Sequence, residues 1–136
     1  MGKRILIICT GNSCRSQMAH GFLQSFDSFL EVYSAGTHPS GGVCHRAIKV
    51  MLESGINIFR HTSDHVNKYL TEDWDYVITV CDNANECCPP FAGEVKRRLH
   101  MGFYDPYESD YSEYRQVRDE IKARFYELFT TELKEK

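Results

Sequence analysis

The amino-acid sequence predicts a single α/β domain, residues 1–136, in which helices flank a parallel sheet. Apolar, β-branched runs alternate along the chain with segments whose apolar residues recur at helical spacing. One run, residues 76–81, lacks a regular apolar–polar alternation, which is typical of a strand buried on both faces of a parallel sheet. Ligands bind such sheets at the carboxyl ends of the strands. Functional residues are therefore expected directly after strands.

The first half of the chain predicts two strand–helix units. Residues 5–9 form a short apolar run that ends at a polar loop, and Met18, Phe22 and Phe26 then recur at helical spacing. Residues 32–36 predict the second strand. After a turn-rich segment, residues 43–52 predict a helix that Gly55 ends.

The second half predicts two further strands and a long helix. Residues 76–81 give the third strand, and residues 99–103 give a weaker fourth one. From residue 111 to about residue 133, apolar residues recur between charged ones, which predicts an amphipathic terminal helix. The segments 88–93 and 105–110 contain proline and are expected to be loops within one domain.

Composition excludes several classes of function. The chain has 16 Lys plus Arg and 19 Asp plus Glu, a net charge of −3, which gives nucleic-acid binding little support. No apolar run approaches the roughly 18 residues of a membrane span. The first residues lack the pattern of a secretory signal, so we expect a cytoplasmic protein, and we expect a monomer. Six cysteines in a reducing compartment indicate metal binding or thiol chemistry rather than a disulfide framework.

The loop after the first strand has the features of an anion site. Cys9 and Arg15 are separated by five residues, and this segment leads from a strand into a helix. Backbone N–H groups at a helix N-terminus converge on an anion, and Gly11 and Asn12 tolerate the dihedral angles of a tight loop. The planar guanidinium of Arg15 is suited to donate hydrogen bonds to two oxygens of a tetrahedral oxyanion at once. The expected anion-binding residues are Thr10, Gly11, Asn12, Ser13, Cys14, Arg15 and Ser16.

Cys9 is the expected nucleophile of this loop. The positive field at a helix N-terminus favours a thiolate, so we expect a lowered pKa for Cys9, and Ser16 is a candidate hydrogen-bond donor to it. The alternative is a small buried hydrophobic residue that ends a core strand. The spacing assigns no chemistry to Cys14, for which we favour a structural role.

Asp105 is a candidate general acid. The dipeptide Asp105-Pro106 follows the weak fourth strand, and a residue before proline favours extended geometry, which gives the carboxyl group a fixed direction. A protonated carboxyl group aimed at the bound anion supplies the proton that a leaving oxygen needs. Ordinary turn chemistry explains the dipeptide equally well.

Cys81 and Cys88 suggest thiol exchange. Cys81 ends a buried strand, as Cys9 does, so both are expected at the same edge of the sheet. Cys88 follows after six residues of an expected flexible loop, which makes exchange with Cys81 feasible after a local rearrangement. The alternative is a set of reduced structural thiols. A zinc site is less favoured because no Cys-x2-Cys pair is present.

Residues 9–19 resemble the phosphate-binding loop of the low-molecular-weight protein tyrosine phosphatase fold, and most closely its arsenate reductase branch. Similar segments include residues 34–36, 61–64 and 105–106. The resemblance implies a flavodoxin-like three-layer fold with a four-stranded parallel sheet. It also implies that Cys9 attacks the oxyanion, that Arg15 holds it and that Asp105 is the general acid.

The chain also resembles thioredoxin-coupled arsenate reductases, and this implies a disulfide relay. Cys9 attacks arsenate, Cys81 then attacks Cys9 as arsenite leaves, and Cys88 resolves the disulfide to Cys81–Cys88 for reduction by thioredoxin. Cys87 is a second candidate for the resolving step. Glutaredoxin is the alternative reductant, although an internal cysteine pair favours thioredoxin.

The same resemblance implies a potassium ion near the loop in some members, at positions that correspond to Asn12, Ser34 and Asp64. His20 departs from the pattern, which has an acidic residue there. We therefore expect no required cofactor, with potassium as the open alternative. His61 and His65 have the spacing of helical metal ligands, but the segment is better suited to a cap or turn.

Two other functions compete with arsenate reduction. A phosphatase acting on phosphotyrosine uses the same Cys9, Arg15 and Asp105 and does not need Cys81 or Cys88. Tyrosines near Asp105 favour that alternative if they stack on the substrate ring, although packing of the terminal helix explains at least the last two of Tyr104, Tyr107, Tyr111 and Tyr114. The other competitor is a non-catalytic module that binds anions or thioredoxin.

Overall fold

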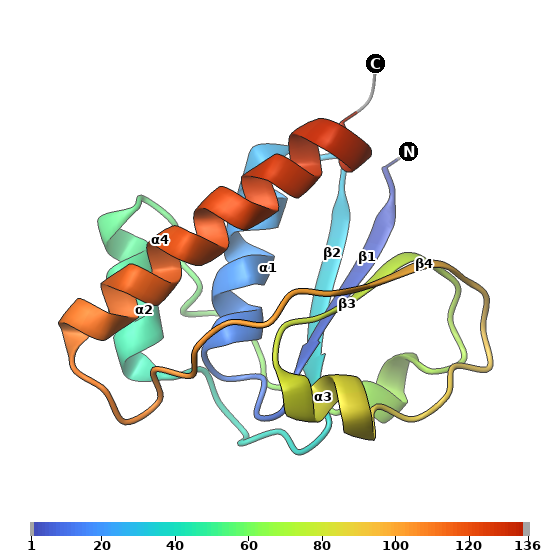
Figure 1. Cartoon of the computed structure of the whole chain (residues 1–136), viewed down its shortest axis with the longest axis horizontal. Coiled ribbons are helices and arrows are strands. Elements are labelled where there is room, and N and C mark those ends of the chain that lie inside the picture. The colour runs from blue at the N-terminus through green and yellow to red at the C-terminus, as the bar shows by residue number, and fades with distance from the viewer. Residues whose placement is uncertain (1, 135–136) are drawn as a thin grey trace.

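The computed structural model describes residues 2–134. Its core is one parallel sheet with the strand order β2-β1-β3-β4 (Figure 1). The strands are β1 (Arg4–Cys9), β2 (Glu31–Gly36), β3 (Trp74–Thr79) and β4 (Val95–His100). This topology is that of the predicted flavodoxin-like fold, in which the strand order reverses beside β1 and ligands bind at that point.

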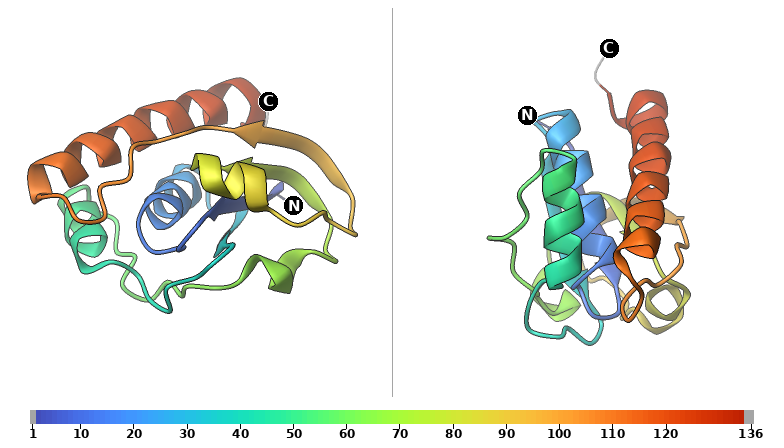
Figure 2. Two further views of the ribbon diagram at one scale, coloured as in Figure 1. Left: turned by 60° about the horizontal axis from the view of Figure 1, so that its bottom comes forward. Right: turned by 90° about the vertical axis from the view of Figure 1, so that its left-hand side faces the viewer.

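The long helices gather on one face of the sheet (Figure 2). The α-helices are α1 (Arg15–Phe26), α2 (His45–Glu53), α3 (Asp82–Cys87) and α4 (Tyr111–Leu128). Helices α1 and α4 pack against each other, α2 joins them at one end, and α3 lies beside the carboxyl ends of β1 and β3. The short helical turns are η1 (Val66–Tyr69) and η2 (Phe129–Leu133).

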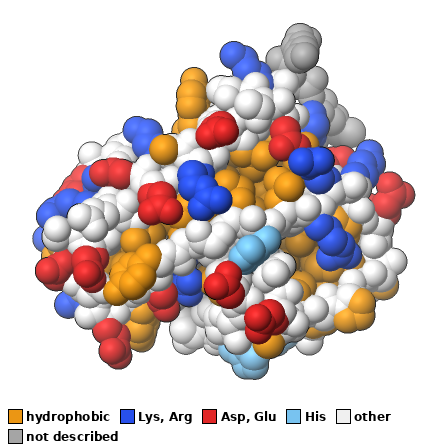
Figure 3. Space-filling view, in the orientation of Figure 1, with side chains coloured by type: hydrophobic (Ala, Val, Ile, Leu, Met, Phe, Trp, Pro, Cys, Tyr) orange, Lys and Arg blue, Asp and Glu red, His pale blue; other side chains and the backbone are white. Residues whose placement is uncertain are grey.

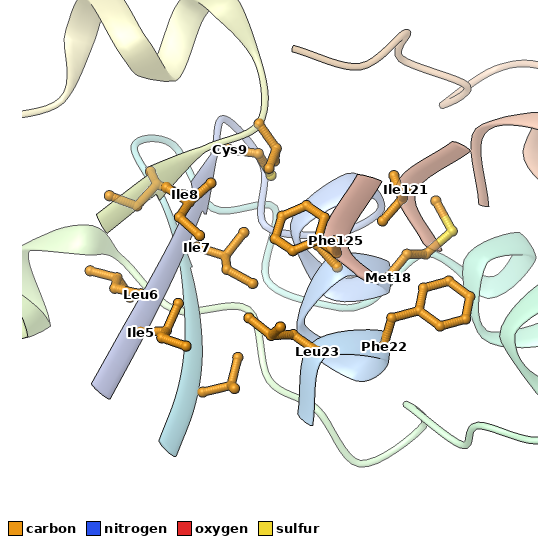
Figure 4. Packing of buried hydrophobic residues seen from close by; sticks show 14 of the residues in the cluster. Ile5, Leu6, Ile7, Ile8, Cys9, Met18, Phe22, Leu23, Ile121 and Phe125 are labelled. Atoms are coloured by element: carbon orange, nitrogen blue, oxygen red, sulfur yellow. The ribbon is translucent and has the colours of Figure 1, made fainter. Parts of the chain in front are cut away.

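The side chains of β1 divide the core into two halves. Ile5, Leu6, Ile7 and Ile8 are all fully buried, because β1 lies inside the sheet and both of its faces are covered. Ile5 and Ile7 point toward α1 and α4, whereas Leu6 and Ile8 point to the opposite side (Figure 4). The continuous apolar run in the sequence follows from this burial on both faces.

Aromatic residues fill the half of the core opposite α1 and α4. The ring of Trp74 lies 5.5 Å from that of Tyr33 and 5.7 Å from that of Tyr69, both in edge-to-face geometry. The Trp74 Nε1–H donates to the carbonyl oxygen of Tyr69 over 3.1 Å. This bond attaches η1 to the sheet, so η1 and its neighbouring loops form the third layer.

The last two strands differ from the sequence prediction in their positions. Strand β3 ends at Thr79, two residues before the predicted end, and β4 spans Val95–His100 rather than 99–103. Strand β4 lies at the edge of the sheet and exposes the three basic residues 96–98. Charged side chains are tolerated on an edge strand, but they remove the apolar pattern by which a strand is recognised.

The segment after β3 is helical, whereas the sequence prediction was a flexible loop. In α3, the backbone N–H of Asn85 donates to the carbonyl of Cys81, and that of Cys88 donates to the carbonyl of Ala84. Ala84 is fully buried and attaches this short helix to the sheet. Six residues are too few for a helical period to be visible in the sequence.

The remaining helices agree with the prediction. Helix α2 ends just before Gly55, which has a φ of 78°, and Asp110 caps α4 by accepting from the backbone N–H of Glu113. Within residues 2–134, no helix is both long and apolar enough to cross a membrane. Acidic and basic side chains intermingle on the face shown in Figure 3, where apolar side chains gather between α4 and β4.

Candidate active site

The anion loop, residues 9–16, connects β1 to α1 at the carboxyl edge of the sheet. Asn12 has a φ of 48° and is the one residue other than glycine within 2–134 in the left-handed region, so the predicted unusual backbone falls on Asn12 rather than on Gly11. Strand β2 approaches the loop closely at Gly36. A Cβ atom at Gly36 would lie 2.4 Å from the carbonyl oxygen of Thr10, so only glycine fits there.

Cys9 lies buried at the base of this loop. Its Sγ lies 2.9 Å from Ser16 Oγ and accepts from the backbone N–H of Asn12 over 3.1 Å. Burial, the largest influence, raises the pKa of Cys9, and the hydrogen bonds from Ser16 and Asn12 act in the opposite direction without reversing it. The expectation of a lowered pKa for Cys9 was therefore wrong, because desolvation of its buried sulfur outweighs these hydrogen bonds.

The side chain of Asn12 connects three parts of the site. Its Nδ2 donates to Ser16 Oγ over 2.8 Å, and its Oδ1 accepts from the backbone N–H of Asp64 over 2.9 Å. Gln17 Nε2 donates to the carbonyl of Asn12 over 3.0 Å. Because Asn12 is fully buried, these bonds fix the loop against the segment around Asp64.

Arg15 and Asp105 meet at the mouth of the loop. Arg15 Nη2 lies 3.4 Å from Asp105 Oδ2, and Arg15 Nη1 donates to the carbonyl of Phe103 over 3.2 Å. Asp105 is 53% exposed, and its Oδ1 accepts from the backbone N–H of Tyr107. Both residues line a pocket of about 240 Å³ together with Cys9. The nucleophile, the arginine and the carboxyl group predicted from the sequence thus share one cavity.

The other loop residues have different neighbours. Thr10 Oγ1 lies 3.3 Å from Cys81 Sγ and donates to Asn83 Oδ1 over 3.2 Å. The carbonyl of Gly11 accepts from Ser63 Oγ over 3.1 Å. Ser13 Oγ and Cys14 Sγ lie 3.7 Å apart and face the interior beside α4. The side chain of Thr10 therefore points toward Cys81.

Cys81 reaches the same edge as Cys9, as the sequence predicted. It follows β3, is buried, and lines a pocket of about 760 Å³ that also includes Thr10, Arg15 and Asp105. A negative charge on Cys81 raises the pKa of Cys9, so the two sulfurs are close enough to interact electrostatically.

Cys88 lies at the far end of α3. Cys81 precedes the helix and Cys88 follows it, so seven residue steps of 1.5 Å separate them by about 10 Å along the axis. A disulfide requires Cα atoms within about 7 Å of each other, so α3 must unwind before these two cysteines can join. Cys88 is half-buried, and burial raises its pKa, whereas Cys87 is exposed.

His100 holds the start of α3 to the sheet, a contact that the sequence analysis missed. Its Nδ1 lies 2.7 Å from Thr79 Oγ1, and its Nε2 lies 2.8 Å from Asp82 Oδ1. Thr79 and His100 are register partners in β3 and β4. Only strand pairing brings these residues together, so no local pattern could have shown the contact.

The residues expected near a potassium ion, Asn12, Ser34 and Asp64, each have a hydrogen-bond partner within the protein. Ser34 Oγ lies 3.0 Å from His20 Nδ1, and Asn12 Oδ1 already accepts from a backbone N–H. The carboxylate of Asp64 accepts from Thr62 Oγ1 over 2.7 Å. Burial and the nearby His61 lower the pKa of His20 to about 3, so a neutral imidazole stands where the family pattern has a carboxylate. Hard cations favour oxygen ligands.

The histidines of the other candidate metal cluster make structural contacts, and the tyrosines near Asp105 divide into buried and exposed ones. His61 stacks on His20 with ring centroids 4.3 Å apart, and His65 Nδ1 accepts from the backbone N–H of Asn67 to cap η1. Within the described residues, no group of three or more His, Cys, Asp or Glu side chains could hold a metal ion. Tyr114 is fully buried, whereas Tyr104 is 62% and Tyr107 is 55% exposed beside Asp105.

The fold and this site define the family of the chain. The family model described as low molecular weight phosphotyrosine protein phosphatase matches residues 4–136, and the chain belongs to that family.

Among its relatives, the chain is 50% identical to arsenate reductase 1 of Staphylococcus epidermidis, over 89% of this chain and 91% of that protein. It is 46% identical to arsenate reductase 1 of Staphylococcus saprophyticus, over 88% and 91% of the two chains. A solved arsenate reductase in the phosphate-binding state is similar with a TM-score of 0.81 and 32% identity, covering 94% of this chain and 97% of that one.

Proposed function

We propose that this protein reduces arsenate to arsenite through Cys9 and an internal disulfide relay. The observation that carries the proposal is the position of Cys81, whose sulfur lies 3.3 Å from the hydroxyl of Thr10, the neighbour of Cys9. Hydrolysis of a phosphate ester does not need this second thiol at the mouth of the pocket. The similarity to arsenate reductases at 50% and 46% identity supports the same activity.

The first step is nucleophilic attack on the bound oxyanion. The Cys9 thiolate forms a bond to arsenic, and one oxygen departs as water after Asp105 donates a proton to it. Arg15 and the N–H groups of the loop and of the α1 N-terminus stabilise the charge on the remaining oxygens. The raised pKa of Cys9 makes the hydrogen bonds from Ser16 and Asn12 important for holding its thiolate.

The second step transfers two electrons to arsenic. The Cys81 thiolate attacks the sulfur of Cys9, an S–S bond forms, and the electron pair of the S–As bond leaves with arsenic as arsenite. The Cys88 thiolate then attacks the sulfur of Cys81, which releases Cys9 as a thiolate and forms a Cys81–Cys88 disulfide. Because α3 separates Cys81 from Cys88, this last exchange requires α3 to unwind.

Thioredoxin is the proposed reductant of the Cys81–Cys88 disulfide. A dithiol reductant returns both cysteines to thiols through a mixed disulfide, and unwinding of α3 exposes the bond to it. We further propose that the protein acts as a monomer in the cytoplasm, where thiols are kept reduced. Size-exclusion chromatography with light scattering tests the monomer, and a dimer at micromolar concentration would contradict it.

We also propose that no metal ion is required. The neutral His20 beside Ser34 supports this proposal, since it occupies the position of the expected acidic ligand. Equal kcat/KM values in potassium and sodium chloride at the same ionic strength are the expected result. A potassium-specific gain of tenfold would contradict it.

The experiment that tests the relay is one turnover of reduced protein with arsenate, followed by thiol trapping and peptide mapping. A loss of two hydrogens that maps to Cys81–Cys88, with arsenate and not with phosphate, is expected. The Cys88→Ser variant should stop at a Cys9–Cys81 disulfide, and Cys87→Ser is the matched control that should complete the relay. A Cys81–Cys87 link in the wild-type protein would assign the resolving role to Cys87.

Phosphotyrosine hydrolysis is the second candidate function. The exposed Tyr104 and Tyr107 beside Asp105 favour it, because aromatic rings at the mouth of a pocket stack on a substrate ring. A phosphatase would retain full activity in the Cys81→Ser and Cys88→Ser variants and leave every thiol free after exposure to arsenate. A non-catalytic module would show no turnover that Cys9→Ser could abolish.

A further inference from the structure

A second pair of thiols meets behind the anion loop. Cys14 belongs to the loop, Cys44 precedes α2, and both sulfurs contact the hydroxyl of Tyr114 on α4. The Tyr114 oxygen lies 3.4 Å from Cys14 Sγ and 3.0 Å from Cys44 Sγ. The relay described above uses neither cysteine, so the role of this Cys14–Cys44 pair does not depend on the reaction that the site catalyses.

The backbone brings the two cysteines into neighbouring segments. The N–H of Cys44 donates to the carbonyl of Ser13 over 2.9 Å, so the residue before Cys14 is hydrogen-bonded directly to Cys44. A disulfide needs Cα atoms that lie close together, and this contact between adjacent backbones favours such an approach. The sulfur of Cys9 faces Ser16 and the N–H of Asn12 instead. Cys44 is therefore the thiol toward which Cys14 is directed.

The pair is accessible from one side. Cys44 is half-buried and lines a pocket of about 560 Å³ with Arg46, Tyr107 and Tyr111. Cys14 is buried and lines the neighbouring anion pocket. A small oxidant therefore reaches Cys44 more readily than Cys14, which is 4% exposed.

We propose that Cys14 and Cys44 form a redox-modification site, in which hydrogen peroxide converts the two thiols into a disulfide that joins the anion loop to α2. The Cys44 thiolate attacks one peroxide oxygen, the O–O bond breaks, and hydroxide leaves to give a sulfenic acid on Cys44. The sulfur of Cys14 then attacks the sulfur of Cys44 and releases the second hydroxide. Two thiol protons and two electrons pass to the peroxide, which leaves as two waters.

The electrostatics of the pair support this order of attack. The hydrogen-bonding interaction between the two thiols, the largest influence, lowers the pKa of Cys44 to about 5 and raises that of Cys14. Tyr114 and the backbone N–H groups of Arg46 and Ala47, at the N-terminus of α2, lower the pKa of Cys44 further, against the effect of burial. Cys44, the more exposed of the two thiols, is thus the nucleophile toward peroxide, and the buried Cys14 is the resolving thiol.

The test maps the disulfide directly. In the Cys9→Ser variant, the tryptic peptide 5–15 carries Cys14 alone and the peptide 16–46 carries Cys44 alone. After treatment with stoichiometric hydrogen peroxide and alkylation of the remaining thiols, these two peptides should be recovered as one cross-linked species that dithiothreitol separates. The wild-type protein, mapped by fragmentation, should give the same link.

Three variants separate this site from non-specific oxidation. Cys44→Ser should abolish the link and leave Cys14 alkylated, and Tyr114→Phe, which keeps the ring, should slow the reaction several-fold. Cys87→Ser, which removes an exposed thiol, should change neither result. Circular dichroism of each variant confirms the fold. Recovery of Cys14 as a free thiol after Cys44 is oxidised, or its linkage to any cysteine other than Cys44, would overturn the proposal.

Discussion

Gly36 illustrates how a single residue positions the anion loop. Its backbone N–H donates to the carbonyl of Asp64 over 2.8 Å, and its Cα faces the carbonyl oxygen of Thr10. A methyl group added at Gly36 would collide with the backbone of Thr10, which cannot move aside as easily as a flexible side chain can. The motif Ser34-Ala35-Gly36 therefore reflects close packing of β2 against the loop.

We predict that Gly36→Ala lowers both stability and anion binding. Relief of a 2.4 Å contact with the Thr10 carbonyl requires movement of the loop, which destabilises the protein by about 1–3 kcal/mol. Urea unfolding and isothermal titration with phosphate measure the two effects. Gly42→Ala is the matched control, because a Cβ there meets nothing within 4 Å. Equal stability of the two variants would contradict this account of Gly36.

The role of Asp105 gives a second prediction at the same scale. Asp105→Asn removes the proton donor for the departing oxygen, so the first step should slow by about 10²–10⁴-fold. Rapid-quench measurement of the loss of the Cys9 thiol after mixing with arsenate gives this rate. Asp110→Asn, which retains an N-cap for α4, should leave the rate unchanged. A change below threefold in Asp105→Asn would exclude the general-acid role.

At the scale of secondary-structure elements, α3 is the part of the molecule that the proposed disulfide relay requires to change. It is six residues long, and Ala84 is its buried residue. Its start is also held by the hydrogen bond that Asp82 Oδ1 accepts from His100 Nε2 and by the one that Thr10 donates to Asn83. A helix this short has little stability of its own, since nucleation is unfavourable and few bonds follow it.

Hydrogen exchange should detect this opening. In the reduced protein, the N–H groups of Asn85 and Cys88 are bonded to the carbonyls of Cys81 and Ala84. After oxidation to the Cys81–Cys88 disulfide, these bonds must break, so we expect faster deuterium uptake across residues 82–88, measured by mass spectrometry. Helix α2 is the internal control and should keep its protection. Unchanged uptake in α3 would show that the disulfide forms without unwinding.

At the scale of the whole molecule, a partly buried histidine couples stability to pH. His20 on α1 stacks on His61, and its pKa is lowered to about 3 by burial and by that neighbour. The unfolded chain takes up a proton near pH 6.5, whereas the folded chain does not. The contribution of the neutral His20 to the free energy of unfolding is therefore complete above about pH 6.5. It is lost as the pH falls toward 3, because the unfolded chain alone gains the proton.

His20→Gln should weaken this pH dependence. Between pH 7 and pH 5, the free energy of unfolding of the wild-type protein should fall by about 2 kcal/mol more than that of the variant. Urea unfolding at both pH values measures the difference. The exposed His45→Gln variant is the control and should follow the wild-type protein. Parallel losses in the wild-type protein and His20→Gln would rule out His20 as the source.

Much of the fold and of the site was visible in the sequence because the signals are local. Residues 5–8 are apolar without interruption since β1 is buried on both faces, and α4 shows its buried stripe at helical spacing. Cys9 and Arg15 lie in one loop between a strand and a helix, so their spacing and the convergence of N–H groups depend on local geometry alone. The parallel sheet then brings Cys81 to the same edge.

Other features were decided only by tertiary structure, because they depend on contacts between distant segments or on burial. Strand β4 exists because it pairs with β3, although its basic residues hide the strand pattern. The pKa of Cys9 rises because the folded core desolvates its sulfur, an effect that the hydrogen bonds from Ser16 and Asn12 do not reverse. Tyr114 brings Cys14 and Cys44 together across 100 and 70 residues of chain, a separation that no spacing rule spans. The sequence by itself therefore determined the α/β class and the anion loop. Packing between distant segments decided that Cys14 and Cys44 meet at Tyr114 and that the sulfur of Cys9 is desolvated in the core.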